Sequence, residues 1–307
     1  SLIFERKRVE NFLLSLCFGA LGAVFGSFAV AQVWRLRAKQ LQDEKASGEK
    51  IDAAEWKKLR SLVSVSPKND RSHCLNCGYQ LKWYDLIPII SWLSLGGKCR
   101  KCRSKIGATE FLVEVSMVAL FAIIFLVFNP LSGTGFSLFG LFRLLILFLA
   151  FIPLAIMFIY DAKWSLLPTK VIWIFNFLAF IYWITAFANT ANGFNFFSAF
   201  NIAVSMALFP LVYFVLAKIS KEEWVGGGDW ILAIGLIFLL PNQPIFAMLL
   251  LFLSNFVGLF FALFQSILQF KKVKRGIRIP FGPAMILATL ILLIFHQFLL
   301  VFTSFIM

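Results

Sequence analysis

Two aspartates at the ends of apolar segments could together hydrolyse a peptide bond. Asp161 ends the run Phe-Ile-Tyr-Asp, and Asp229 follows three consecutive glycines at 226–228. In such a pair one ionised carboxylate activates water and one protonated carboxyl donates to the carbonyl oxygen, because close like charges share a single proton. The glycines would allow backbone conformations closed to other residues and bring Asp229 close to a partner helix. For each aspartate alone, a helix cap at a hinge is an equally good interpretation.

No other catalytic set is evident in the sequence. The chain contains two histidines, His73 and His296, and it has neither an HExxH motif nor a phosphate-binding loop. Schemes that rely on histidine, such as a Ser-His-Asp triad, are therefore poorly supported. His296 lies within an apolar segment and is expected to be a packing residue.

Cysteines provide a second constellation. Four of the five form two closely spaced pairs, Cys74 with Cys77 and Cys99 with Cys102. Two Cys-x-x-Cys knuckles are typical of a tetrahedral Zn²⁺ site, whose closed shell of four thiolates leaves no position for water, so the metal would be structural. Disulfides are the alternative, but the cytoplasmic location that the charge distribution predicts would disfavour them. A module of about 35 residues needs a bound metal or another cross-link to hold it together. His73 precedes the first knuckle and is a possible alternative ligand, but with four sulfurs available it is expected to be a bystander. Cys17 is expected to pack in an apolar span.

The composition places the chain in a membrane. Hydrophobic residues make up 60% of the chain, charged residues 14%, and mean hydropathy is +0.85, outside the range of soluble domains. Apolar runs with no more than one charged residue, near the length of about 20 residues that a spanning helix needs, cover 12–34, 111–128, 144–160, 171–187, 196–217, 245–270 and 281–307. A shorter run, 230–240, precedes Pro241 and Pro244, which predicts a short half-buried helix leading into a full span. The expected fold is an all-α polytopic membrane protein with about eight transmembrane helices, one of them short, and a small zinc-binding cytoplasmic insert.

The distribution of charge predicts the orientation. The net charge is +14, more than half of the 29 Lys and Arg residues lie within 35–105, and a second basic cluster lies at 271–278. Basic residues are retained on the cytoplasmic side, so both segments and, by parity, Asp161 and Asp229 are expected at the cytoplasmic membrane face. This orientation leaves the basic run 6–8 outside. Because the charges flank spans, we expect contact with anionic lipid and no nucleic-acid partner.

Three parts follow along the chain. They are a first transmembrane span at 1–34, a cytoplasmic insert with a linker and the cysteine module at 35–110, and a peptidase transmembrane domain at 111–307. Within the insert, residues 38–69 are rich in Lys, Glu, Asp, Gln and Ala, which predicts a solvated helix or linker. The first span is too long and too far from a small-residue cleavage site to read as a removed signal peptide.

Together these residues resemble the prepilin peptidase family, also called type IV leader peptidases, which are membrane aspartic proteases with a Gly-x-Gly-Asp signature. The resemblance covers nearly the whole chain. The matching segments are Gly26-Ser27-Phe28 with Arg35-Leu36, the cysteine module with Asp85-x-Ile87-Pro88 and Ser91-Trp92-Leu93, Glu114, Asp161 with Leu167-Pro168, Gly226-x-Gly228-Asp229, and Pro280-Phe281-Gly282-Pro283.

The resemblance implies an aspartic endopeptidase of the bacterial inner membrane, with Asp161 and Asp229 as catalytic residues. It also implies four residues that position the substrate or the site, namely Gly226, Gly228, Pro168 and Glu114. The substrates would be type IV prepilins or pseudopilins, cut after a Gly in a short basic leader. Bacterial members often methylate the new amino terminus, an activity associated with the cysteine module, so S-adenosylmethionine joins zinc as an expected cofactor.

The chain departs from the family pattern at three positions. Val30 stands where the family usually has Asn, Thr169 where it has an acidic residue, and Ile231 where it has Lys. Neither aspartate changes, so the expectation of proteolysis stands, while contacts to substrate or methyl donor differ. The alternative class is a non-enzymatic transporter or assembly scaffold with a structural zinc module, whose carboxylates bind a cation.

Overall fold

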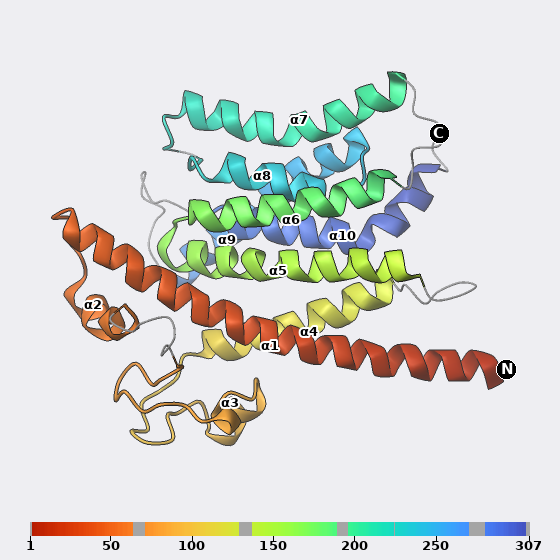
Figure 1. Ribbon diagram of the computed structural model, residues 1–307. Coiled ribbons are helices and arrows are strands. Elements are labelled where there is room, and N and C mark those ends of the chain that lie inside the picture. Colours follow the sequence, from red (N-terminus) through yellow and green to blue (C-terminus); the bar gives the residue numbers. More distant parts are fainter. Residues whose placement is uncertain are drawn as a thin grey trace. The chain divides into compact units, whose positions relative to one another are not determined.

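The computed structural model describes residues 2–63, 71–128, 137–188, 196–223, 225–269 and 280–304, and most of them are helical (Figure 1). The chain divides into two compact units, unit 1 (Ser1–Leu126) and unit 2 (Val127–Met307). The division at residues 34 and 110 expected from the sequence stays a prediction. The basic cluster 271–278, which the predicted orientation uses, lies outside the described residues.

Within the described residues, five helices are long and apolar enough to cross a membrane. They are α1 (Leu2–Ala46), α4 (Ala108–Phe128), α5 (Leu138–Trp164), α7 (Phe196–Ile219) and α9 (Pro244–Gln269). Two others, α6 (Thr169–Ala188) with 20 residues and α10 (Gly282–Ser304) with 23, also reach the length of a span. The helix α8 (Asp229–Phe238) has only 10 residues. The predicted all-α polytopic fold with one short membrane helix is therefore confirmed.

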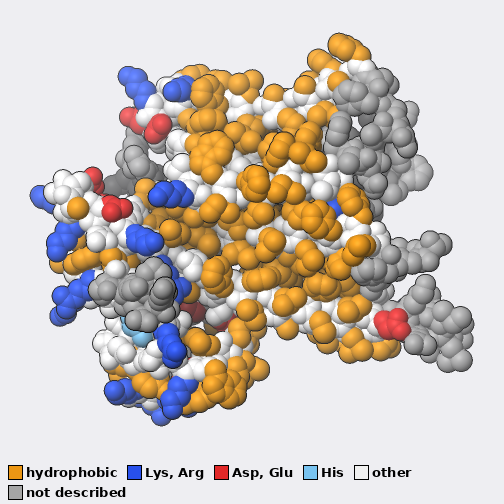
Figure 2. Space-filling view, in the orientation of Figure 1, with side chains coloured by type: hydrophobic (Ala, Val, Ile, Leu, Met, Phe, Trp, Pro, Cys, Tyr) orange, Lys and Arg blue, Asp and Glu red, His pale blue; other side chains and the backbone are white. Residues whose placement is uncertain are grey.

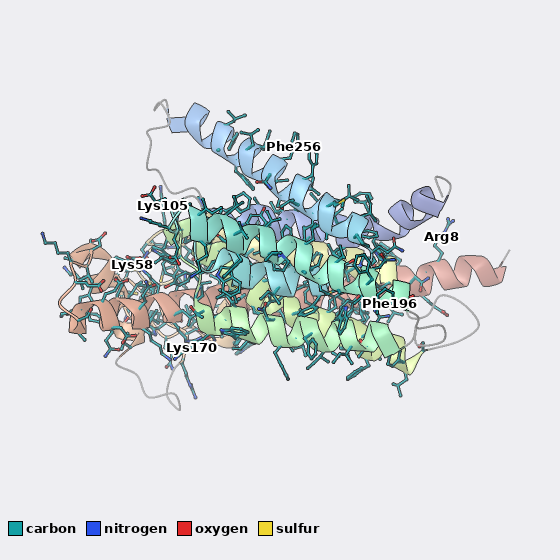
Figure 3. The ribbon with its side chains drawn as sticks, turned by 90° about the horizontal axis from the view of Figure 1, so that it is seen from above. Arg8, Lys58, Lys105, Lys170, Phe196 and Phe256 are labelled. Carbon is teal, nitrogen blue, oxygen red and sulfur yellow. The ribbon has the colours of Figure 1, made fainter. Side chains whose placement is uncertain are left out.

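Hydrophobic side chains cover the flanks of these helices (Figure 2). On α9, Phe252, Phe256 and Phe260 are 71%, 59% and 63% exposed, and Phe256 lies on the outer face of the helix (Figure 3). A soluble protein would hide such side chains, whereas lipid tails solvate them. The surface is that of a membrane protein.

Unit 1 begins with α1, which continues without a break through the predicted start of the insert to Ala46. The helix α2 (Ala53–Leu59) and the 3-10 turn η1 (Arg60–Leu62) then pack back on it around Ala38, Leu41 and Leu59. Asp52 caps α2 by accepting hydrogen bonds from two backbone amides of its first turn. The segment predicted as a solvated helix or linker is thus a packed helical extension, except that residues 64–70 lie outside the described ranges.

The second long helix of unit 1, α4, packs against α1 through small residues. A Cβ on Gly22 would contact the Met117 carbonyl oxygen, and one on Gly26 would lie 3.1 Å from the Glu114 Cα. Aromatic rings fill the rest of the contact, with the centroids of Phe18 and Phe125 4.8 Å apart. Small residues that admit a neighbouring backbone are a common way to pair helices in lipid, where apolar surface alone gives no preference.

In unit 2, α8 lies at the centre and contacts α6, α7 and α10, while α5 packs on α6 and α10 (Figure 1). The α8 side chains Leu232, Ala233 and Leu236 are fully buried. Gly235 allows the close crossing with α6, because a Cβ there would meet Asn176 and Phe175. Pro244 opens α9 shortly after α8 ends, so the predicted short helix followed by a full span is confirmed.

Candidate functional site

Asp161 lies in the last turn of α5 and is 5% exposed. Its Oδ2 accepts a hydrogen bond of 2.9 Å from the backbone amide of Gly282, the first residue of α10. A Cβ on residue 282 would lie 2.6 Å from the same oxygen, so only glycine fits there. The helix α5 ends directly afterwards at Ser165, which adopts the left-handed conformation with φ 51°.

Asp229 is the first residue of α8 and is 7% exposed. Its Oδ2 accepts a hydrogen bond of 2.9 Å from the backbone amide of Gly226. A carboxylate in the first turn of a helix is favoured by the helix dipole. A cavity of about 530 Å³, whose walls include Gly227 and Trp230, opens beside the segment that carries Asp229.

The structure brings the two aspartates to the same end of unit 2. Leu167, between α5 and α6, lies next to a glycine from each aspartate's surroundings. A Cβ built on Gly228 would lie 3.0 Å from the Leu167 Cβ, and one built on Gly282 would lie 3.5 Å from the Leu167 Cδ2. The charge of Asp229 acts on the carboxyl group of Asp161. Each carboxyl therefore sits in a buried place, held by a glycine amide and within electrostatic reach of the other.

The three glycines before Asp229 do not adopt the unusual backbone conformations that the sequence predicted. None of them has a positive φ, since the described glycines with positive φ are Gly48, Gly78, Gly96 and Gly97. Close approach is the reason for glycine instead. A Cβ on Gly226 would lie 3.3 Å from Asp229 Oδ2, and a Cβ on Gly228 would press on Leu167.

The two remaining positioning candidates lie in different units. Pro168 precedes α6, and its carbonyl oxygen accepts hydrogen bonds from the amides of Val171 and Ile172, which starts that helix beside the aspartates. Glu114 belongs to α4 in unit 1, where its carboxylate accepts a hydrogen bond of 2.7 Å from the Ile89 amide and another from Ser27. Its contacts therefore tie the insert to α1 and α4.

The four predicted cysteine ligands form one cluster in unit 1. Their Sγ atoms all lie within 4.8 Å of one another, and those of Cys74 and Cys102 are 3.8 Å apart. No disulfide joins them, and four thiolates at this spacing fit a tetrahedral metal with bonds of about 2.3 Å. His73 is not part of the cluster, because its Nε2 lies 3.1 Å from the Ser61 hydroxyl.

The two knuckles have the same local structure. Gly78 follows the first pair and Arg103 the second, both have a positive φ, 69° and 58°, and each donates its amide to the carbonyl oxygen of the first cysteine in its pair. The Ser104 hydroxyl, 3.1 Å from the sulfur, lowers the pKa of Cys102 to about 5. This shift favours the thiolate of Cys102, the form that binds metal.

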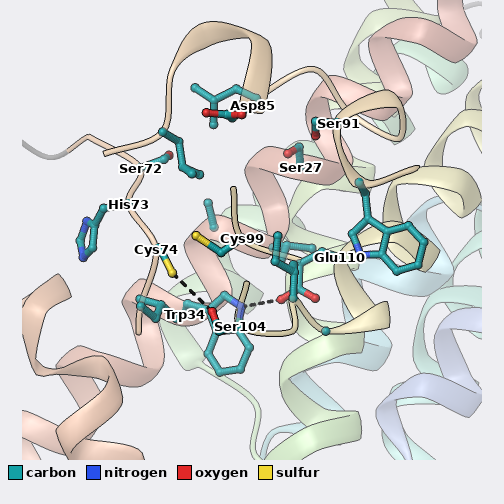
Figure 4. Close-up of a pocket in the computed structure, with 18 of the residues that line it drawn as sticks. Ser27, Trp34, Ser72, His73, Cys74, Asp85, Ser91, Cys99, Ser104 and Glu110 are labelled. Atoms are coloured by element: carbon teal, nitrogen blue, oxygen red, sulfur yellow. Dashed lines mark hydrogen bonds between the residues drawn. The ribbon is translucent and has the colours of Figure 1, made fainter. Parts of the chain in front are cut away.

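A cavity of about 300 Å³ lies between this cluster and the two long helices of unit 1 (Figure 4). Trp34 Nε1 donates to Glu110 Oε1 over 3.2 Å, and Asp85 on the wall accepts a hydrogen bond of 2.8 Å from Arg100. Two buried atoms, Trp92 Nε1 and Glu110 Oε2, have no hydrogen-bond partner within the described part of the chain. Such atoms are costly unless a ligand or water satisfies them.

Two features of these sites were not assigned a role from the sequence. The Gly282 amide contacts Asp161 across a separation of 121 residues, and the only signal was the Pro-Phe-Gly-Pro motif itself. The cavity beside the cysteine cluster gave no signal, although Trp92 stood in a recognised segment.

Comparisons with known proteins found related sequences. Residues 20–128 match the family described as the bacterial peptidase A24 N-terminal domain. The chain is 28% identical to a prepilin leader peptidase/N-methyltransferase of Vibrio cholerae over 92% of this chain and 96% of the relative. It is 27% identical to the protein of that name from Pseudomonas aeruginosa, over 89% and 87%, and 26% identical to the one from Dichelobacter nodosus, over 88% and 87%. No solved structure matches.

These similarities extend through both units of the chain. The all-helical membrane fold agrees with them. Over most of its length the chain is similar to prepilin leader peptidases, and its N-terminal third matches the bacterial peptidase A24 N-terminal domain.

Proposed function

We propose that the protein is an aspartic endopeptidase that removes the leader from type IV prepilins or pseudopilins, with Asp161 and Asp229 as its catalytic residues. One observation carries the proposal. Two buried carboxyl groups from helices far apart in the sequence lie at the same end of unit 2, and each accepts a hydrogen bond from the amide of a glycine. A Cβ would clash with the carboxylate at Gly282 and would have little space at Gly226. The substrate class follows from the names of the relatives.

The reaction needs one ionised and one protonated carboxyl. The ionised group takes a proton from water, whose oxygen bonds to the carbonyl carbon, while the other carboxyl donates its proton to the carbonyl oxygen. The carbon–nitrogen bond then breaks, and the amine leaves with the proton taken from water. A pair of carboxyls within electrostatic reach is suited to this division, because both cannot ionise at once.

We place the reaction at the cytoplasmic face of the bacterial inner membrane. Asp161 ends α5 and Asp229 begins α8, so both lie at helix ends and near the lipid boundary. The basic residues of the insert support a cytoplasmic location for it, by the retention of Lys and Arg on that side. A cut at this face would act on the leader before the pilin helix leaves the bilayer.

Single variants of the aspartates test the proposal. Asp161→Asn and Asp229→Asn retain an oxygen that accepts from Gly282 or Gly226, so folding should be kept while proton transfer is lost. We expect the rate of cleavage to fall by about 100- to 10 000-fold, measured by mass spectrometry of a purified prepilin. The matched control is Glu223→Gln, an exposed carboxylate near Asp229 in the sequence, which should cleave normally. Normal cleavage by either aspartate variant would refute the assignment.

The cysteine cluster is proposed to bind one structural Zn²⁺. Cys74, Cys77, Cys99 and Cys102 supply four sulfur ligands, and such a shell prefers Zn²⁺ to the oxygen-seeking Mg²⁺ or Ca²⁺. Because four protein ligands fill a tetrahedral shell, the metal would hold the module together and take no part in hydrolysis.

The cavity of unit 1 is the proposed site of the methyl donor. When bound, S-adenosylmethionine supplies an electrophilic methyl group. The lining has both signs of charge, and so does this molecule. Glu110 and Glu114 would face its sulfonium and ammonium groups, and basic residues such as Arg71 and Lys105 would face its carboxylate. Trp34 and Trp92 bring aromatic rings, and two buried polar atoms lack a partner in the described residues. Trp92 is held in place by stacking on Phe111, with ring centroids 4.6 Å apart.

Direct binding tests this assignment without relying on activity. Trp92→Phe keeps the ring but removes the indole N–H, and it should weaken binding of S-adenosylmethionine by about 10-fold in calorimetry. Trp83→Phe is the matched control, because Trp83 is 76% exposed. Peptidase activity should be unchanged in both variants. Equal affinity of the two variants would exclude the cavity as the binding site.

A further inference from the structure

The opposite end of unit 2 carries a charge that the proposed peptide hydrolysis does not use. Arg143 lies in the second turn of α5, at the end of that helix remote from Asp161. Between Glu114 and the last residue, the only acidic residues are Asp161, Glu222, Glu223 and Asp229. Asp161 is 18 residues further along α5, about 27 Å at 1.5 Å per residue. Unit 2 therefore provides no acidic side chain for Arg143 at this end.

The contacts of Arg143 leave its charge only partly compensated. The guanidinium carbon lies 5.0 Å from the centroid of the Tyr182 ring on α6, a cation–π contact. Its Nε is buried and has no hydrogen-bond partner within the described ranges. A buried guanidinium nitrogen of this kind is costly unless an acceptor is supplied.

Arg143 faces a cavity of about 700 Å³ in unit 2. Its other polar walls are formed by amide side chains and a histidine, namely Asn201, Asn242, Gln243 and His296. His296 is held by a hydrogen bond of 2.6 Å from its Nδ1 to the Leu293 carbonyl oxygen and by stacking on Phe128. Asn242 accepts a hydrogen bond of 2.6 Å from Trp183. One cation and several amide groups around one space are suited to an oxyanion.

The depth of the cavity indicates where the oxyanion comes from. The helix α5 has 27 residues, about 40 Å, and it exceeds a hydrocarbon core of about 30 Å by some 5 Å at each end. Arg143 is five residues from the first residue of α5, so it lies close to the boundary between hydrocarbon and headgroups. Arginine side chains at this depth extend toward lipid phosphates.

We propose that this cavity binds a phosphate group, supplied by the headgroup of an anionic lipid in the leaflet opposite the aspartates or by free phosphate. Arg143 provides the charge, Tyr182 holds the guanidinium in place, and the amide groups donate to the remaining oxygens. The bound group would supply the negative charge that unit 2 lacks here and would fix the ends of α5, α6 and α8 relative to one another.

Two arms of one experiment distinguish the sources. In the first, protein from nanodiscs of mixed phosphatidylglycerol and phosphatidylcholine is examined by native mass spectrometry for retained lipid. In the second, inorganic phosphate is added to protein in phosphatidylcholine nanodiscs, and the rise in melting temperature is measured. Retention of phosphatidylglycerol identifies the lipid as the source, whereas stabilisation by inorganic phosphate alone identifies the free ion.

Variants of the cavity decide the proposal. Arg143→Gln should reduce retention or stabilisation by about 10-fold, and Arg143→Lys, which keeps the charge, should restore most of it. Lys170→Gln, at the other end of α6, is the matched control and should behave as the wild type. Asn201→Asp places a carboxylate on the wall and should abolish binding even if Arg143→Gln does not fold. The proposal would be overturned by a wild type that neither retains phosphatidylglycerol nor is stabilised by phosphate. Unchanged retention and stabilisation in Asn201→Asp, or in a folded Arg143→Gln, would also overturn it.

Discussion

The two units hold their chemically important side chains in different ways. In unit 1, the four cysteines project from two short turns, and their sulfurs lie within 4.8 Å of one another, so the proposed metal would hold the two turns together. In unit 2, Asp161 and Asp229 lie at the ends of buried helices, and glycine amides orient their carboxyl groups. On the proposed assignment, a bound metal would position the cysteine side chains, whereas close backbone approach positions the aspartates.

Removal of the metal should have the largest effect on stability, and only in unit 1. Cys99→Ser takes away a buried sulfur, and structural zinc contributes about 10–16 kcal/mol in small domains. We expect metal content to fall from one per chain toward zero and the amides of the module to lose hydrogen-exchange protection. Cys17→Ser, which changes a cysteine outside the cluster, is the control. Equal protection in the two variants, or a wild type without zinc, would show that the module does not need the metal.

Adding a methyl group beside each aspartate should slow cleavage more at the position with less space. Gly282→Ala places a Cβ 2.6 Å from Asp161 Oδ2, whereas Gly226→Ala places one 3.3 Å from Asp229 Oδ2. The first must displace the carboxylate, and a displacement of about 1 Å costs roughly 100-fold in rate. The second requires a shift of a few tenths of an ångström, so less than about 10-fold is expected. Kinetics with a prepilin would contradict this account if the order were reversed.

The smallest effects should come from the turns of the two knuckles. Gly78 and Arg103 share the left-handed conformation, and a Cβ on Gly78 would meet no atom within 4 Å. Gly78→Ala should therefore cost about 1 kcal/mol through backbone strain alone. Arg103→Gly should change stability by less than about 0.5 kcal/mol, because relief of strain is offset by the flexibility of glycine in the unfolded chain. Denaturant unfolding measures both changes in stability, and equal effects of the two variants would contradict the assignment of strain to these two turns.

Local patterns predicted most of the fold. Apolar runs gave the helices, Pro241 and Pro244 gave the short helix before α9, and the spacing of the cysteines gave their cluster. These signals are contained within about 30 residues, so hydrophobic periodicity and ligand geometry suffice to read them. Both aspartates were also recognised, although their roles remain a proposal.

Contacts between distant segments could not be predicted in the same way. The contact of the Gly282 amide with Asp161 depends on how α10 packs against α5, and the glycines at 226–228 serve close packing instead of unusual φ angles. The continuation of α1 into the insert arises because Leu41 and Ala38 bury against Leu59. In each case tertiary packing determines the local structure, and a local sequence pattern carries no information about that packing.

The central claim is that Asp161 and Asp229 act as one unit, and a double-variant cycle tests it most directly. Cleavage rates of a prepilin would be measured for Asp161→Asn, Asp229→Asn and the double variant in the same nanodiscs. If the two carboxyls share one proton-transfer function, the double variant should be no slower than the slower single variant. Losses that multiply, or a single variant that cleaves at the wild-type rate, would show that the two residues do not form a catalytic pair.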